Sequence, residues 1–366
     1  MSGNRRVAAL EIVPVNIRLT ENFAIANGAP TIAKNVFVRT ILRDGTVGYG
    51  EAAPFEEVSG ETQHGTLMAM QRAADLIVGA DVASWRSCSC AIKSSIPDYP
   101  AARSALEQSL LDSFARHLDI SLLNFLGGVA QPLMTDITIP AKDVDHARIG
   151  ARRAADSGFD FVKVKVGGSQ GWHRDVERIT AIVDEAPGLE LIVDANGAFS
   201  TDDASLFLEE LNERGVVLAL FEQPVAPEDR KGLGEIERRH GVLVCADESV
   251  RNPVDAIRLS SEEDGASVWN IKTMKLGVVD AMEVMAIARA SGKSCMIGGM
   301  IESVVSMSFS AALAVANNDL FDYVDLDTPL FMSEPRIAGG MVYENARISL
   351  DQTHPGTGVD ASNLFE

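Results

Sequence analysis

The chain carries two hydrophobic patterns, and the change between them falls near Gly128. Residues 5–54 contain runs in which apolar and polar residues alternate, VAALEIVPVNIRL and NVFVRTILRDGTVGYGEAAP. Such alternation is typical of strands, and Asp44-Gly45 in the second run is a hairpin signal. Residues 61–126 show helical spacing instead, as in ARSALEQSLLDSFARHL. Strands followed by helices predict an α+β domain.

After Gly128 a short apolar run followed by an amphipathic stretch recurs along the chain. The runs are MTDITIP, FVKVKVGG, LELIVDANG, LALFEQP, VLVCADES, SVWNIKTMK, SCMIGGM and YVDLDTP. One residue from each run marks the period: Ile137, Lys163, Asp194, Glu222, Asp247, Lys272, Gly298 and Asp325. These markers lie 25 to 31 residues apart, the length of a βα unit. Eight such units predict an α/β protein built on a TIM barrel.

The eighth unit departs from the repeat, because residues 330–352 contain MVYENARISL, which reads as further strands. We therefore predict three segments along the chain. These are an α+β domain over 1–128, a barrel over 129–330, and a C-terminal segment over 331–366 that returns to the first domain. No low-complexity linker separates them in the sequence, so we expect the domains to pack tightly.

Composition and charge restrict the partners. The chain has 366 residues, of which 46% are hydrophobic, enough for a large core. Its formal net charge of −20 argues against nucleic acid and anionic membranes, whose phosphates need a basic face. We expect a small-molecule substrate, and the global charge does not exclude an acidic one, because the local field in a cleft can differ.

Targeting signals and disulfides are not expected. No run approaches the roughly 20 apolar residues of a membrane span, and the N-terminal stretch lacks the apolar core and cleavage site of a secretory signal. Cys88, Cys90, Cys245 and Cys295 show neither disulfide nor metal-site spacing. We expect a cytoplasmic protein with reduced cysteines.

Two lysines share one face of the run FVKVKVGG. In a strand, residues i and i+2 point the same way, so Lys163 and Lys165 point together while the valines take the other face. Catalytic groups of TIM barrels lie at the C-terminal strand ends. Three successive runs end there in Asp194, Glu222 and Asp247. Separate carboxylates with room for water suit Mg²⁺, which predicts a magnesium site.

Lys272 ends the sixth run, across the barrel from Lys165 in the second. A metal between two lysines suits removal of the weakly acidic proton beside a carboxylate, with return of the proton from the other face. Free lysine, with a pKa of about 10.4, is a poor base at neutral pH. We expect Lys163 and Mg²⁺ to lower the pKa of the base.

Each piece also has a structural interpretation. Asp194-Ala-Asn-Gly alone is more often a turn, Asp247-Glu-Ser alone is more often a helix cap, and a single barrel-rim lysine is more often an ion-pair partner. Three carboxylates in register between lysines are hard to obtain by coincidence, which favours the catalytic interpretation.

These pieces resemble the enolase superfamily, in particular its muconate-lactonizing-enzyme subgroup. The motifs are KVKVGG, VDANGAF, FEQPV, ADESV and NIKTMK, in family order and over essentially the whole chain. The resemblance implies a modified (β/α)7β barrel with an N-terminal α+β capping domain completed by a C-terminal segment. It implies Mg²⁺ on Asp194, Glu222 and Asp247. It also implies Lys165 and Lys272 as the acid/base pair, with Lys163 assisting at the substrate carboxylate. The mandelate-racemase branch is disfavoured, because SCMIGGM lacks its histidine.

The run DLDTPLFM resembles the motif by which dipeptide epimerases hold the substrate α-ammonium group. Asp325 and Asp327 face the same way, and two carboxylates suit a cationic amine with three donors. Two aspartates that only solvate a strand end are the structural alternative. The resemblance implies inversion of the C-terminal residue of an L,L-dipeptide.

Loops of the capping domain are expected to set specificity. The Ala-Glu epimerases that the chain resembles supply an arginine from the first loop, where this chain has Gly28 in ENFAIANGAP. Phe23, Ile25 and Phe55 predict an apolar lid, which favours a hydrophobic or neutral side chain over Glu. Glu56 and Glu57 leave a cationic side chain open.

Other functions stay open at this stage. An o-succinylbenzoate synthase or N-acyl amino-acid racemase would share the metal and lysines but give Asp325 and Asp327 no evident role. A relative that kept the fold and the metal but lost turnover is the non-enzymatic alternative. We also expect a homo-oligomer.

Overall fold

The computed structural model describes residues 3–20, 30–260, 265–333 and 337–366. The N-terminal part contains an antiparallel sheet in the order β1-β2-β3. A hairpin at the predicted Asp44-Gly45 turn joins β2 to β3. Gly45 has a φ of 88°, a conformation that favours glycine. The strands are β1 (Val7–Arg18), β2 (Ile32–Leu42) and β3 (Val47–Ala52).

Helices pack beside this sheet, and the α+β prediction for the first domain is confirmed. They are α1 (Glu56–Ser59), α2 (Gln63–Ile77), α3 (Trp85–Ser95), α4 (Pro100–His117) and α5 (Leu122–Phe125). Helix α4 is buried along nearly its whole length, because it lies between β3 and helices of the second part. Gly50 makes this approach possible, since a Cβ there would lie 2.0 Å from the carbonyl oxygen of Ala105.

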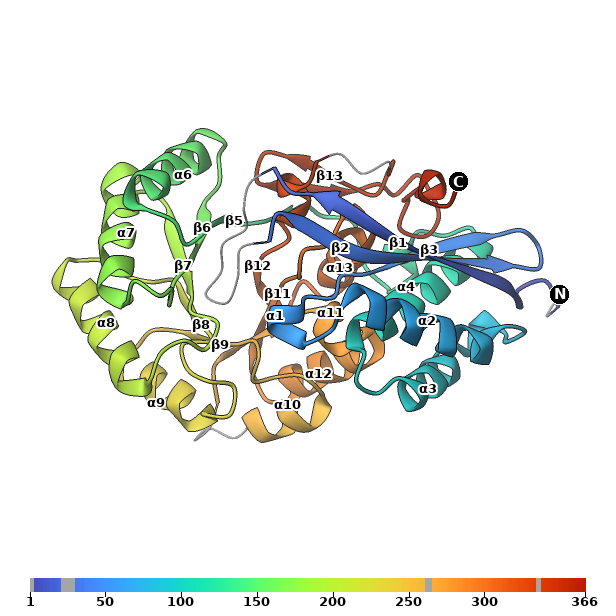
Figure 1. Cartoon of the computed structure of the whole chain (residues 1–366), viewed down its shortest axis with the longest axis horizontal. Helices are drawn as coiled ribbons and strands as arrows, with labels where there is room; N and C mark the ends of the chain where they lie inside the picture. Colours follow the sequence, from blue (N-terminus) through green and yellow to red (C-terminus); the bar gives the residue numbers. More distant parts are fainter. Residues whose placement is uncertain (1–2, 21–29, 261–264, 334–336) are drawn as a thin grey trace.

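The second part is a curled sheet of eight parallel strands in chain order. The strands are β5 (Ile137–Ile139), β6 (Phe161–Lys165), β7 (Glu190–Asp194), β8 (Leu220–Glu222), β9 (Val244–Ala246), β10 (Val268–Ile271), β11 (Ser294–Ile297) and β12 (Phe321–Val324). All eight predicted runs are therefore strands. Figure 1 shows the capping elements beside α11 and α13, on the side of the barrel away from α6–α9.

Helices follow the strands from β5 to β11, whereas β12 leads into a 3₁₀ turn (Thr328–Phe331). This arrangement confirms the expected (β/α)7β barrel. No ladder joins β12 to β5, but the Asp136 N–H donates to the Val324 carbonyl at 2.9 Å. The helices are α6 (Val144–Asp156), α7 (Trp172–Glu185), α8 (Thr201–Glu213), α9 (Arg230–His240), α10 (Pro253–Leu259), α11 (Thr273–Leu276), α12 (Val278–Ala290) and α13 (Val304–Ala316).

The C-terminal strands pair beside the barrel, while the chain after them returns to the capping part. β13 (Met341–Glu344) and β14 (Arg347–Leu350) form a sheet with β4 (Leu133–Met134), not with the capping strands. The chain beyond them does reach the capping elements, where the Thr357 N–H donates to Asp112 at 2.7 Å and the Arg116 guanidinium donates to the Val359 carbonyl at 2.6 Å. The domain boundaries at 128 and 330 stay predictions.

The core lies between the barrel strands and their helices. Val162 and Val164 of β6 point into it, while Lys163 and Lys165 take the opposite, inward face, as the strand alternation predicts. Within the described residues, no helix combines the length and apolar character that crossing a membrane requires.

Candidate active site

The polar strand ends stand on an apolar floor. Ile192, Leu220, Cys245, Val268 and Met296 form a separate buried cluster. Four of them lie two residues before Asp194, Glu222, Asp247 and Asn270. Because i and i+2 share a strand face, each polar residue stands one layer above an apolar one. The floor keeps the site dry from below.

The three predicted metal ligands stand on adjacent elements of the barrel. Asp194 and Glu222 lie opposite each other in the β7–β8 ladder, and Asp247 follows β9. All three are buried, with relative exposures of 0%, 0% and 1%. Buried carboxylates need cationic or hydrogen-bond partners, and lysines supply them here.

Lys163 is the centre of this charge network. Its ammonium nitrogen lies 2.6 Å from Asp325, 2.7 Å from Glu222 and 3.3 Å from Asp194. The two lysines of β6 therefore are not left unpaired in the barrel. Lys163 joins the predicted metal ligands to the predicted amine site.

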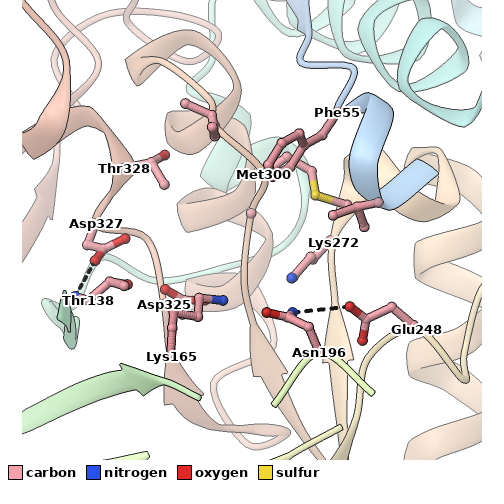
Figure 2. A pocket seen from close by; sticks show the side chains of 13 residues that line it. Phe55, Thr138, Lys165, Asn196, Glu248, Lys272, Met300, Asp325, Asp327 and Thr328 are labelled. Carbon is pink, nitrogen blue, oxygen red and sulfur yellow. Dashed lines mark hydrogen bonds between the residues drawn. The ribbon is translucent and has the colours of Figure 1, made fainter. Parts of the chain in front are cut away.

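Lys165 and Lys272 approach the cavity from opposite sides, with their nitrogen atoms directed toward the space between them (Figure 2). Lys165 donates to Asp194 at 2.5 Å and Lys272 donates to Asp247 at 2.6 Å. Each predicted base thus lies against a predicted metal ligand. This arrangement suits proton transfer at an atom held between them.

Neighbouring carboxylates raise the pKa of two of the three lysines. Burial acts to lower the pKa of Lys272, but the carboxylates of Asp247 and Glu222 outweigh burial and raise that pKa. The pKa of Lys163 is raised in the same way by Asp325 and Glu222. The expected lowering of the base's pKa by Lys163 and Mg²⁺ stays a prediction.

The oxygen groups around the three carboxylates fit a hard divalent cation. Burial acts to raise the pKa of Asp194, but Lys165 and Lys163 outweigh it and hold that pKa at about 2. The pKa of Asp247 is lowered by Lys272 and Lys275 against the effect of burial. Buried oxygens of Asn196, Glu248 and Asn270 also have no hydrogen-bond partner among the described residues. Burial and the neighbouring Asp194 raise the pKa of the third carboxylate, Glu222. Ionised carboxylates, as at Asp194 and Asp247, and free oxygens are the ligands that Mg²⁺ prefers.

A second group of carboxylates lies beside Lys163. Asp136, Asp325 and Asp327 offer oxygens that all lie within 4.8 Å of one another. Asp327 accepts a hydrogen bond from the Thr138 N–H at 2.6 Å, as Figure 2 shows. Both Asp136 oxygens and one of Asp327 have no hydrogen-bond partner within the described parts of the chain. Burial and the neighbouring Asp325 raise the pKa of Asp327 to about 7.

Asp136 was missed in the sequence. It stands directly before β5, in the run MTDITIP, and only the near closure of the barrel brings it beside Asp325. The signal that could have found it is an aspartate at the start of an otherwise apolar run.

The wall of the cavity is apolar on one side. Phe55 and Val58 come from the capping part, and Met300 and Ile301 come from the loop after β11. Asn196 and Glu248 line another side, joined at 3.2 Å. Of the predicted specificity residues, the structure places Phe55 at the cavity, while Phe23, Ile25 and Gly28 lie outside the described residues.

Comparison with known proteins agrees with this fold. Residues 7–127 match the mandelate racemase / muconate lactonizing enzyme N-terminal domain, and residues 146–363 match the enolase C-terminal domain-like family. An aromatic dipeptide epimerase from Herpetosiphon aurantiacus is 42% identical over 94% of this chain and 96% of its own. A hydrophobic dipeptide epimerase from Citrifermentans bemidjiense is 36% identical over 93% and 94%.

One similar protein has been solved with Mg and a dipeptide bound to it. The dipeptide epimerase of Enterococcus faecalis V583, complexed with Mg and the dipeptide L-Leu-L-Tyr, superposes with a TM-score of 0.92 at 28% identity, covering 97% of this chain and 99% of that one. With both domain families matched and relatives similar along nearly their whole length, the chain belongs to the mandelate racemase / muconate lactonizing enzyme family of the enolase superfamily.

Proposed function

We propose that this protein is a Mg²⁺-dependent dipeptide epimerase that inverts the α-carbon of the C-terminal residue of an L,L-dipeptide. The observation that carries the proposal is the pair Lys165 and Lys272, which reach one cavity from opposite sides. Two bases on opposite faces allow a proton to leave one face and return to the other, and this inverts the stereocentre.

Asp194, Glu222 and Asp247 would hold the magnesium ion. When bound, it supplies positive charge beside the substrate carboxylate as the α-proton leaves. Lys163, within 2.7 Å of Glu222, adds a fixed positive charge to the same region. Lys165 and Lys272 carry the proton, one as acceptor and the other as donor.

The acidic group at Asp325 suits the free α-ammonium of the dipeptide. A tetrahedral ammonium that donates to three oxygens at about 2.8 Å separates those oxygens by about 4.6 Å. The oxygens of Asp136, Asp325 and Asp327 lie within 4.8 Å of one another. Buried carboxylates with unpartnered oxygens also need a cation, which an N-acylated substrate lacks. This argues against the o-succinylbenzoate synthase and N-acyl amino-acid racemase alternatives.

The apolar wall favours a hydrophobic side chain on the inverted residue. Phe55, Val58, Met300 and Ile301 offer no charge to a carboxylate or an ammonium. The relatives named for aromatic and hydrophobic dipeptides support this preference over glutamate.

The experiment is a library of L,L-dipeptides incubated with the enzyme and Mg²⁺ in D₂O. We expect deuterium at the α-carbon of the C-terminal residue, fastest for L-Ala followed by a hydrophobic residue. Fastest turnover of a cationic residue would favour the cationic-dipeptide alternative. No exchange with any dipeptide would point to the inactive metal-binding relative and overturn the proposal.

Alanine variants test the two-base assignment in the same assay. Lys165→Ala and Lys272→Ala should each lose epimerisation by at least about a thousandfold, while one face can still exchange its proton. The matched control is Lys231→Met on α9, where the lysine is exposed. Full activity of either alanine variant would refute the assignment.

We further propose a cytoplasmic, homo-oligomeric enzyme. Cys88, Cys90, Cys245 and Cys295 are all free, which supports a reducing compartment. Size-exclusion chromatography with light scattering tests the oligomeric state.

A further inference from the structure

We propose that Lys275 is a positioning residue that holds Asp247 in the orientation needed for metal binding. The inference rests on the proposed function in one respect, the assignment of Asp247 as a ligand. Lys275 was not among the residues singled out in the sequence, because it lies beyond its strand, on the short helix α11.

The Lys275 ammonium group uses all of its hydrogen-bond donors. Its ammonium nitrogen lies 2.6 Å from the Asp247 carbonyl oxygen, 2.7 Å from Asp247 Oδ1 and 2.8 Å from the Asn270 carbonyl oxygen. An ammonium has three donors, and all three are used. The side chain is 7% exposed and does not line the cavity, so Lys275 acts on the reaction through Asp247.

Asp247 is also held at its backbone N–H. Gln223 Oε1 accepts that hydrogen bond at 2.9 Å, and the Gln223 amide donates to the Ser249 hydroxyl at 2.8 Å. The backbone N–H, the carbonyl and one carboxylate oxygen of Asp247 are therefore all fixed. The other oxygen, Oδ2, faces Lys272 at 2.6 Å and is the one left toward the cavity.

Two effects of Lys275 on a bound cation oppose each other. Its positive charge repels the cation, which would weaken binding. Its hydrogen bonds fix the ligand and prevent both Asp247 oxygens from turning to the ion, which favours an ion that requires strict geometry. Because Lys275 is fully hydrogen-bonded and stands behind Asp247, we infer that the orienting effect is the larger.

The choice of ion separates orientation from general stability. Mg²⁺ requires near-ideal octahedral geometry, whereas Ca²⁺ accepts variable and bidentate carboxylates. Loss of Lys275 should therefore weaken Mg²⁺ binding more than Ca²⁺ binding. A purely structural loss would weaken both ions equally.

The experiment is calorimetric titration of the metal-free full chain with MgCl₂ and with CaCl₂. Loss of a residue that orients a ligand typically costs 10- to 100-fold in metal affinity. We expect Lys275→Met to raise the Mg²⁺ Kd by about that factor and the Ca²⁺ Kd by less. Lys231→Met is the matched control, expected to equal the wild type.

Other results would overturn the proposal. An unchanged or lower Mg²⁺ Kd in Lys275→Met would mean that charge repulsion dominates, and equal losses for both ions would mean a structural role. If Lys275→Met does not fold, Lys275→Gln keeps two of the three donors without the charge and should show the same ordering of the ions. Wild-type protein that binds Mg²⁺ but exchanges no dipeptide would remove the proposed function without touching this inference, whereas wild-type protein that binds no Mg²⁺ would remove both.

Discussion

Asp327 sits where a carboxyl group can titrate near neutrality. Burial comes first and the neighbouring Asp325 second in raising its pKa to about 7. The raised pKa means that the ionised form is lost as the pH falls through about 7. The residue is fully buried, so it can act on a substrate ammonium without screening by water.

We predict that kcat/KM for a dipeptide falls about tenfold between pH 7.5 and pH 6, because only ionised Asp327 attracts the ammonium. The ammonium itself, with a pKa of about 7.7 to 8.0, is more fully charged at pH 6 than at pH 7.5, so its titration opposes the fall and cannot cause it. Asp327→Asn should be slower throughout and lose this part of the pH dependence. Asp322→Asn, at an exposed position on β12, should keep it. A flat wild-type profile would contradict the prediction.

At the scale of single residues, strand-end positions in the sequence identify most of the buried polar residues that line the candidate site or contact its lysines. Residues at strand ends could be found, because strand alternation and barrel geometry place them without knowledge of the rest of the fold. Asp136 and Lys275 could not be found in this way. The place of Asp136 beside Asp325 depends on how the first and last barrel strands meet. The place of Lys275 beside Asp247 depends on the path of α11.

At the scale of elements, α4 is the contact between the two parts of the molecule. It touches β3 on one side and α11 and α12 on the other. The predicted helical spacing was correct, but the spacing alone did not show that α4 is buried nearly all round. Small residues on the facing strand are what permit this close contact.

Gly50→Ala should destabilise the protein by about 3 kcal/mol, as expected for overpacking against backbone atoms. The added Cβ would meet the Ala105 carbonyl oxygen at 2.0 Å and the Ser109 nitrogen at 3.0 Å, neither of which can move without shifting α4. Urea unfolding measures the effect.

Gly188→Ala is the control, because a Cβ at Gly188 meets nothing within 4 Å. It should change stability by no more than about 0.5 kcal/mol. Equal stability of Gly50→Ala and wild type would show that β3 and α4 can separate at little cost.

At the scale of the whole molecule, Asp112 connects three segments that are far apart in the sequence. It accepts hydrogen bonds from the Tyr49 N–H of β3 at 2.9 Å, from Arg116 of α4 at 2.8 Å and from the Thr357 N–H at 2.7 Å. This buried carboxylate therefore helps to hold the C-terminal tail on the capping part, together with the hydrogen bonds of Val359 with Arg116 and of Gly356 with Ile120 and Leu122.

Asp112→Ala should lower the free energy of unfolding by about 3 kcal/mol, because it leaves buried donors and Arg116 without this partner. Limited proteolysis should also cut residues 355–366 earlier than in the wild type. Asp75→Ala, at an exposed position of α2, should behave as wild type. A tail that stays protected in Asp112→Ala would contradict the proposed connection.

The whole-molecule topology was predictable where it followed a repeat, since the period of 25 to 31 residues identified eight strands in order. The C-terminal strands had no such guide. Their pattern showed that they are strands, but their partner, the two-residue strand β4, is too short to be read from a periodicity. Their pairing therefore could not be predicted.

The four apolar residues of the cavity wall belong to different segments of the chain from the charged groups. Phe55 and Val58 belong to the capping part and Met300 and Ile301 to one barrel loop, while the lysines of the acid/base pair and the three carboxylate ligands stand at strands β6 to β10 or directly after them. A substitution in the wall leaves the proton-transfer groups and their ion pairs in place. During divergence from a common ancestor, such an enzyme could therefore exchange one dipeptide for another by single mutations, each of which leaves a working catalyst for selection to act on.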